Sequence, residues 1–596
     1  MPHDYSSIII DGVFIYAALV YYDDIFFMKK KCSLFDIIAV MVFLDPLPPR
    51  REGETICYKK IGESMSFLLL FKSMPLPFLT LFLPLAGSGC YGLLLLYNKF
   101  FSKRLGRTLV LPKVCYKLPF LILLVAGTVL SCLVWMSVSG SYSPLYVFTS
   151  TGWSNVLTSE SVKNAQAVLR IDAFGAISAA LMSFVALTAG IRALADRQNL
   201  ITPRKVFFLL LTCAGIQGIF YLNNLVPLFL FMLLTQIGVT GLYSNFATKK
   251  REGGESVFYY ISRVLLLAMF LAGVILLRFK YGTDNINLLA SMIAPANETL
   301  WAFIFLVVPL LYIFVKPSPY LPDASRNCFF GIRTQASLFI AFRVIFSLYG
   351  PMQGLQKVPM LLILLGFAAV LLALVLSCGA KDPERFMNSM VFYMKGMILI
   401  SIGIAMDGTF SAERAALYGV SAIEAMISLW LMFLPVSAAL SIITVFLKQS
   451  YEGRELWQEG ALLKRIPFTA VALFIVIAVL AGLPPFIGYS GKQLLFRSAN
   501  FMSPFVLTSL FLFTVTMLLT GLRFLITLTI GKVSQKRDFN FSGEVTIAFP
   551  LFLLLMLFIT TTVLPGELFE ESVAPSVESL INRTAPSDLT PVEVSK

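Results

Sequence analysis

Long apolar segments separated by short polar ones dominate the sequence between residues 76 and 565. A helix that crosses a bilayer needs about 20 apolar residues, and a window of roughly 19 residues locates such helices. The pattern therefore predicts an all-α polytopic membrane protein with about 14 transmembrane helices. The expected spans are residues 76–97, 118–138, 171–195, 206–222, 225–246, 257–277, 299–316, 331–350, 358–378, 388–406, 416–446, 466–500, 503–530 and 545–565.

The basic residues of the loops support this count. Lys and Arg gather in the loops on one side of a membrane. Here the basic clusters follow only odd-numbered spans, and the other loops carry few or balanced charges. The alternation predicts an even number of crossings, with both ends of the bundle on the outer side. The clusters contain Lys99, Lys103, Arg104, Arg107, Lys113, Arg197, Arg204, Lys205, Lys249, Lys250, Arg251, Lys448, Arg454, Lys464, Arg465, Lys532, Lys536 and Arg537.

Three regions follow from the same pattern. Residues 1–75 form an N-terminal extension, in which Ser7–Tyr22 is apolar enough for one extra membrane segment. Residues 76–565 form the transmembrane domain, and residues 566–596 form a polar C-terminal tail.

The amino-acid composition limits which partners and binding sites this chain is expected to have. Only 13% of the residues are charged and the mean hydropathy is +0.82, whereas a soluble domain carries about 25% charged residues. The net charge of +14 is explained by the basic loops, so we expect no nucleic-acid partner. The eight cysteines show no metal-binding spacing, His3 is the only histidine, and no phosphate-binding or flavin motif occurs. We expect neither a metal nor a cofactor on this chain.

The segment 481–496 breaks the apolar pattern at membrane depth. Pro484 and Pro485 remove two backbone donors and exclude a regular helix. Such breaks persist only where protein or a water-filled cavity satisfies the backbone. Lys492 follows the break, where burying a charge costs about 2.5–3.5 kcal/mol. A broken helix with a buried lysine is typical of an ion-translocating site.

This segment resembles a known signature. Leu480–Phe496 is similar to the G-[IL]-P-P-x-x-G-[FY]-x-x-K block of the antiporter-like membrane subunits of respiratory complex I, most of all those of the subunit 2 type. Weaker blocks occur in the family's order, and the resemblance covers residues 76–565. They are Leu169–Phe174, Asn224–Phe231, Tyr320–Ala324, Glu384-Arg385 and Leu522-Arg523.

The resemblance implies two inverted five-helix repeats, each with a discontinuous helix, and a chain of buried lysines plus one glutamate that carries protons. Lys492 matches the lysine of the twelfth helix, and Arg343 falls on that of the eighth. Two positions depart from the family, because Leu233 replaces the fifth-helix glutamate and Leu311 the seventh-helix lysine. Arginine stays protonated in proteins, so Arg343 can hold charge or water but hardly release a proton.

Further charges fall inside the expected spans. Lys395 lies in the tenth span and Glu424 in the eleventh, and a lysine–glutamate pair on facing helices could hold a proton between them. Pairing of Lys395 with Glu424 or with Lys492 is the hypothesis. Arg263 and Lys316 are interpreted as side chains that snorkel to a membrane edge.

The expected function is that of a proton-translocating membrane-arm subunit of NADH:ubiquinone oxidoreductase. The resemblance implies that NADH, FMN, iron–sulfur clusters and ubiquinone bind partner subunits, and that the chain joins other membrane-arm subunits and lipids in a hetero-oligomer. It also implies the mitochondrial inner membrane, with a bacterial plasma membrane as the alternative. Two other functions stay open: a subunit of a multisubunit sodium/proton antiporter, and a structural membrane-arm subunit that pumps nothing.

Overall fold

A computed structural model describes most of the chain from residue 76 to residue 581. The chain divides into two compact units, Met1–Leu79 and Thr80–Lys596. The expected N-terminal extension and Tyr320–Asp323 lie outside the described residues. Those residues are 76–100, 113–140, 145–147, 169–195, 201–247, 253–293, 300–316, 324–350, 353–380, 382–451, 466–530, 541–563 and 569–581.

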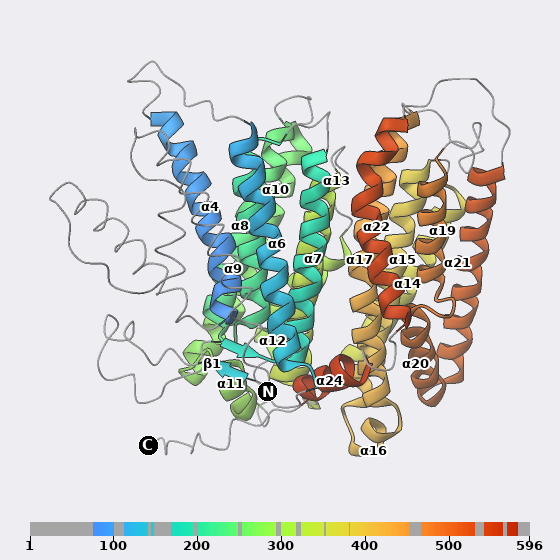
Figure 1. Cartoon of the computed structure of the whole chain (residues 1–596). Helices are drawn as coiled ribbons and strands as arrows, with labels where there is room; N and C mark the ends of the chain where they lie inside the picture. The colour runs from blue at the N-terminus through green and yellow to red at the C-terminus, as the bar shows by residue number, and fades with distance from the viewer. Residues whose placement is uncertain are drawn as a thin grey trace, which may run out of the picture. The chain divides into compact units, whose positions relative to one another are not determined.

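Helices make up nearly all of the described residues and run side by side in Figure 1. The helices of the first half are α4 (Leu76–Phe100), α6 (Lys113–Val138), α7 (Ala173–Ala195), α8 (Pro203–Tyr221), α9 (Leu225–Ala247), α10 (Gly253–Tyr281), α11 (Ile286–Ile293), α12 (Leu300–Val315), α13 (Ala324–Phe342) and the π-helix η4 (Arg343–Tyr349).

The second half continues in the same way after the short turn η5 (Gln353–Leu355). Its helices are α14 (Val358–Cys378), α15 (Pro383–Gly408), α16 (Ala412–Arg414), the π-helix η6 (Ala415–Gly419), α17 (Val420–Tyr451), α19 (Pro467–Ala481), α20 (Ile487–Met502), α21 (Pro504–Ile530), α22 (Phe541–Val563), the π-helix η8 (Phe569–Val573) and α24 (Ala574–Ile581).

The predicted spans are confirmed. Among the described residues, eleven helices are long and apolar enough to cross a membrane, and three shorter apolar helices lie in α12, α19 and α22. Together they match the expected spans one for one. The fold is that of an all-α polytopic membrane protein.

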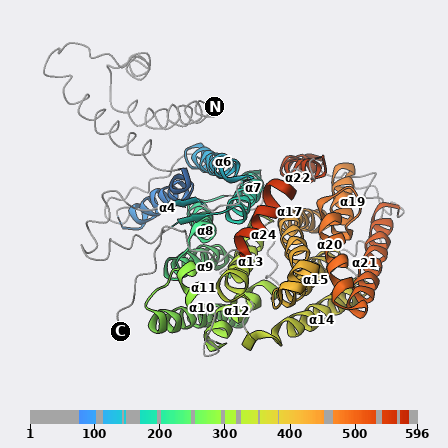
Figure 2. The same cartoon turned by 90° about the horizontal axis from the view of Figure 1, so that it is seen from below.

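Two five-helix sets form the body of the second unit. The first set is α8, α9, α10, α12 and α13, and the second is α14, α15, α17, the broken α19–α20 and α21; Figure 2 shows the sets side by side. In each set the first helix packs on the second, the third on the fourth and the fourth on the fifth. Because each set has five crossings, the second begins on the opposite side and is inverted relative to the first.

Glycines explain why the first two helices of each set pack so closely. A Cβ at Gly215 of α8 would lie 2.7 Å from the Thr235 nitrogen of α9. In the second set, a Cβ at Gly366 of α14 would lie 2.9 Å from the Gly396 oxygen of α15. Small residues let membrane helices approach to backbone contact, and the same device recurs at the same place in both sets.

The structure adds features that the apolar pattern did not predict. The segment before α7 forms strand β2 (Leu169–Ile171), which pairs antiparallel with β1 (Leu145–Val147). The long span 416–446 begins with a π-helical turn and then continues unbroken past Pro435, whereas the span 466–500 is broken.

Helices η8 and α24, inside the segment taken as the polar tail, dock against the bundle. The Trp135 Nε1 donates a hydrogen bond to the Ser572 Oγ at 3.1 Å, and the Ser347 hydroxyl donates to the Leu580 carbonyl at 3.2 Å. Arg170 of β2 donates to the Ser579 carbonyl at 2.6 Å. These contacts fasten η8 to α6, and α24 to η4 and β2.

Candidate functional site

The break between α19 and α20 exposes helix carbonyls inside the second set. Helix α19 ends at Gly482, whose φ of +70° is the left-handed conformation that favours glycine. In a continuous helix the Leu480 carbonyl would accept a hydrogen bond from residue 484. That residue is Pro484, which has no N–H, so the break leaves an acceptor without its helical donor.

Lys492 supplies that missing donor. Its side chain is 2% exposed, and its Nζ donates to the Leu480 carbonyl at 2.7 Å. Gly482 makes room for this path, because a Cβ there would lie 2.5 Å from the Lys492 Cδ. The negative end of a helix dipole favours a cation. The break therefore builds a socket in which a buried ammonium is stabilised.

An aromatic ring forms the other wall of this socket. The Lys492 Nζ lies 5.5 Å from the centre of the Tyr393 ring on α15, within the range of a cation–π contact. The Tyr393 hydroxyl lies 3.3 Å from the Thr514 Oγ1 of α21. Tyr393 thus joins the socket to a second hydroxyl on the neighbouring helix.

Lys395 lies on α15 of the second set, but residues of the first set give it surroundings similar to those of Lys492. It is 4% exposed, and its Nζ donates to the carbonyl of Lys316, the residue after α12, at 3.4 Å. The same Nζ lies 5.6 Å from the centre of the Phe314 ring. Each buried lysine therefore meets the C-terminal end of the fourth helix of one set and an aromatic ring.

Helix α15 separates the two lysines. Tyr393 and Lys395 are two residues apart, which is about 200° around a helix with 3.6 residues per turn. One face of α15 therefore presents Tyr393 to Lys492, and the opposite face presents Lys395 to α12. The two lysines do not pair directly; a proton that moves between them must pass around α15.

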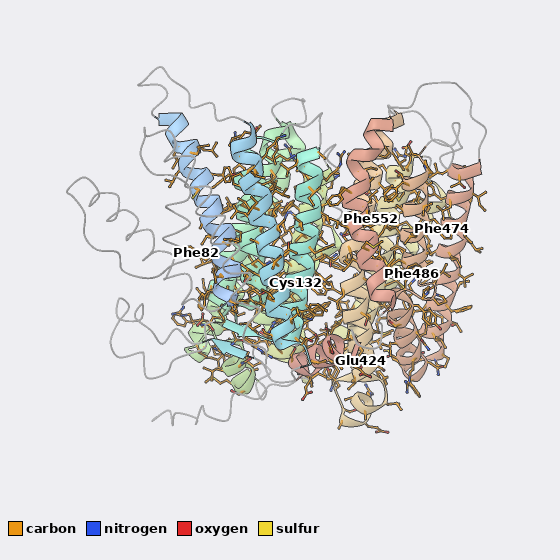
Figure 3. The ribbon with its side chains drawn as sticks, in the orientation of Figure 1. Phe82, Cys132, Glu424, Phe474, Phe486 and Phe552 are labelled. Atoms are coloured by element: carbon orange, nitrogen blue, oxygen red, sulfur yellow. The ribbon has the colours of Figure 1, made fainter. Side chains whose placement is uncertain are left out.

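Glu424 lies on the seam between α17 and α20. It is half-buried and feels the charge of Arg497 on α20. Figure 3 shows it near the lower end of α17, whereas Phe486 of the break lies near mid-height. Among the ion pairs of the described residues, none joins Glu424 to Lys395 or Lys492.

Hydroxyl groups follow the same seam on both sides of Glu424. The Ser421 and Ser498 hydroxyls lie 3.0 Å apart across it. One turn beyond Glu424, the buried Ser428 hydroxyl has no hydrogen-bond partner among the described residues. A Cβ at Gly491, the neighbour of Lys492, would lie 3.1 Å from the Ser428 Cβ. Polar side chains therefore line the contact between α17 and α20 from Glu424 to the socket of Lys492.

Arg343 is held by a different group of residues. Its Nη2 lies 2.7 Å from the Asp172 Oδ1, and both side chains are buried. Asp172 also lies 3.3 Å from the Arg170 Nε and accepts from the Gly175 N–H at 2.8 Å, as a capping residue of α7 does. Arg343 therefore belongs to a buried ion-pair network that ties η4, β2 and α7 together.

Three further positions show how charged and apolar side chains are placed in the first set. Leu233, at the family's glutamate position, faces outward and is exposed, while Leu311 is half-buried. Arg263 is 3% exposed inside the bundle, so its interpretation as a snorkelling side chain is wrong. The sequence could not show this, because most of the residues of α10 around Arg263 are apolar and indicate no single buried face.

Comparisons with known proteins support the helical membrane fold and the resemblance to antiporter-like membrane subunits. No family model matches the sequence. The D-type subunit of a Na⁺/H⁺ antiporter from Alkalihalophilus pseudofirmus is 25% identical over 367 residues, covering 58% of this chain and 71% of the relative. The N-type subunit of NADH-quinone oxidoreductase from Desulforamulus reducens is 26% identical over 271 residues, covering 43% of this chain and 53% of the relative.

Solved structures agree on the fold. A subunit of the archaeal membrane-bound sulfane sulfur reductase superposes with a TM-score of 0.68 at 18% identity, covering 85% of this chain and 98% of that one. A subunit of respiratory complex I from Thermus thermophilus gives a TM-score of 0.61 at 16% identity, covering 85% of this chain and all of that one. Sequence and fold together identify the chain as a relative of the antiporter-like membrane subunits found in Na⁺/H⁺ antiporters and NADH-quinone oxidoreductases.

Proposed function

We propose that this chain is a proton-translocating subunit of the membrane arm of NADH:ubiquinone oxidoreductase. The observation that carries the proposal is the pair of buried lysines on opposite faces of α15, each beside the end of a helix. A buried lysine is costly in a membrane and is therefore a functional residue by default. Two such residues in corresponding surroundings suit stepwise proton transfer.

The seam between α17 and α20 supplies the route to the first lysine. Glu424 accepts a proton at the lower end, and water beside the Ser428 hydroxyl passes it to Lys492. Transfer continues around α15 to Lys395. Arg343 remains protonated and, with Asp172, contributes fixed charge to the proton pathway.

The energy for this transfer comes from partner subunits. In this proposal NADH, FMN, the iron–sulfur clusters and ubiquinone bind there, and no redox centre is assigned to this chain. The chain works in a hetero-oligomer with other membrane-arm subunits and lipids, which agrees with its structural relatives being subunits of multisubunit membrane complexes. We assign it to the mitochondrial inner membrane, with a bacterial plasma membrane as the alternative.

Two other functions compete with this one. The similarity to the D-type antiporter subunit favours a role in a multisubunit sodium/proton antiporter. Leu233 on the outer face of α9 and the half-buried Leu311 favour a structural subunit that pumps nothing. The buried lysines oppose that last function, because a structural subunit would not need them.

These functions can be distinguished by solubilising the membranes mildly and separating the native complexes by electrophoresis. The band that contains the chain is then stained for NADH oxidation and analysed by mass spectrometry. We expect a very large NADH-oxidising assembly. A small band of hydrophobic antiporter subunits without NADH oxidation would assign the chain to cation/proton exchange. Unchanged proton translocation by an NADH-oxidising assembly that carries Lys395→Met would indicate that Lys395 is structural.

A further inference from the structure

A small cavity lies between α4, α6, α7, α8 and α13, away from the two buried lysines. Its open centre is about 30 Å³, and a water molecule needs roughly 10–15 Å³, so it has room for about two. None of its wall residues is charged. They are Thr80, Pro84, Leu123, Leu124, Gly127, Met182, Ser183, Ala186, Leu210, Cys213, Ile216, Gln217 and Ile332.

The amide of Gln217 on α8 gives this cavity a polar side. Its Nε2 donates to the Ala179 carbonyl at 3.5 Å, to the Ser131 Oγ at 3.3 Å and to the Ser183 Oγ. Because a carbonyl oxygen only accepts hydrogen bonds, the contact with Ala179 fixes which end of the amide is the nitrogen. The other end, the Oε1, is buried and has no hydrogen-bond partner among the described residues.

The two serine hydroxyls beside Gln217 use their hydrogens elsewhere. The Ser183 hydroxyl donates to the Ala179 carbonyl at 2.8 Å, and the Ser131 hydroxyl donates to the Gly127 carbonyl at 2.8 Å. Both oxygens therefore act as acceptors for the Gln217 Nε2. A buried acceptor without a donor is costly, so the Gln217 Oε1 requires a donor from inside the cavity.

Water meets the requirements of this site. It is neutral, it donates hydrogen bonds, and it fits the volume. A cation would find no opposite charge on the wall, and an apolar molecule would leave the Gln217 Oε1 without a donor. We propose that this cavity binds two ordered water molecules, which bridge Gln217 of α8 to Ser183 of α7 and Thr80 of α4. Water that joins buried polar groups in this way is part of a protein's structure.

Oxidation by radicals formed from bound water tests this proposal in the full-length chain in lipid nanodiscs. A short X-ray pulse splits water into hydroxyl radicals, and these oxidise a methionine next to the water. Met182 lies in the cavity wall and is 1% exposed; Met387 of α15 is equally buried and lies outside that wall. We expect Met182 to be oxidised several-fold faster than Met387. Equal rates would overturn the proposal.

Filling the cavity gives a second test by thermal unfolding. Ala186→Val extends a wall residue into the cavity, so it should displace water, leave the Gln217 Oε1 without a donor and lower the unfolding midpoint. Gln217→Met keeps the length of the side chain but removes the acceptor. In that background Ala186→Val should lower the midpoint clearly less. An equal fall in both backgrounds would indicate steric strain alone, and a rise in the single variant would indicate a cavity without water; either result would overturn the proposal.

Discussion

Replacing Gly482 with alanine tests whether the helix break is a socket for Lys492. Gly482 has a φ of +70°, in which alanine costs about 1–2 kcal/mol. The new Cβ would also lie 2.5 Å from the Lys492 Cδ and 3.3 Å from its Cε. Moving a packed side chain costs about 1–3 kcal/mol more. We therefore expect Gly482→Ala to lower the free energy of unfolding by about 2–5 kcal/mol.

Gly282 provides a matched control at the end of α10. Its φ is also +70°, but a Cβ there would meet no atom within 4 Å. Gly282→Ala should therefore lose only the backbone contribution of about 1–2 kcal/mol. The assay is detergent-driven unfolding of the reconstituted chain, followed by tryptophan fluorescence. Proton translocation by the assembled complex should fall in Gly482→Ala and stay normal in Gly282→Ala.

A double-mutant cycle assigns the difference to Lys492. In a Lys492→Ala background the added methyl group at Gly482 meets no lysine stem and keeps only the Gly488 carbonyl oxygen at 3.3 Å, so most of its extra cost should disappear. Equal losses of stability in Gly482→Ala and Gly282→Ala would refute the reasoning. An extra cost that keeps its full size without Lys492 would also refute it.

Two further pairs of substitutions test the ion-pair network and the helix packing by the same unfolding assay. Asp172→Asn removes the carboxylate beside Arg343 and should lower the free energy of unfolding by about 3–5 kcal/mol. Asp382→Asn breaks an exposed ion pair and should lower it by less than about 1 kcal/mol. Equal losses of stability in the two variants would contradict a buried ion-pair network. Gly366→Ala drives a Cβ to 2.5 Å from the Ile400 Cγ1 and should cost about 1–3 kcal/mol. Gly379→Ala has its nearest neighbour at 3.6 Å and should stay within about 1 kcal/mol; similar stability in the two variants would exclude close α14–α15 packing.

The order of helices and the position of the break could be predicted from the sequence. Apolar length alone locates a membrane helix, and Pro484-Pro485 cannot continue one. The resemblance marked Lys492 within its motif. These features are local, so a short window of residues contains the information that specifies them.

The partners of the buried charges could not be predicted in this way. Glu424 and Lys395 lie on helices that are apolar on nearly every side, so periodicity does not indicate which face each presents. Asp172 lies far from Arg343 in the sequence, and only the packing of α13, which continues into η4, against α7 brings them together. Arg263 was misplaced for the same reason, since burial depends on neighbouring helices rather than on position within the span.

The most direct test of the central claim measures protons translocated per NADH oxidised in sealed vesicles that contain the assembled complex with Lys492→Met. Methionine keeps an unbranched apolar stem, one atom shorter than the side chain of lysine, but cannot carry a proton. We expect the complex to assemble and oxidise NADH while proton translocation falls well below that of the unaltered complex. Unchanged proton translocation per NADH would contradict a proton pathway through the buried lysines.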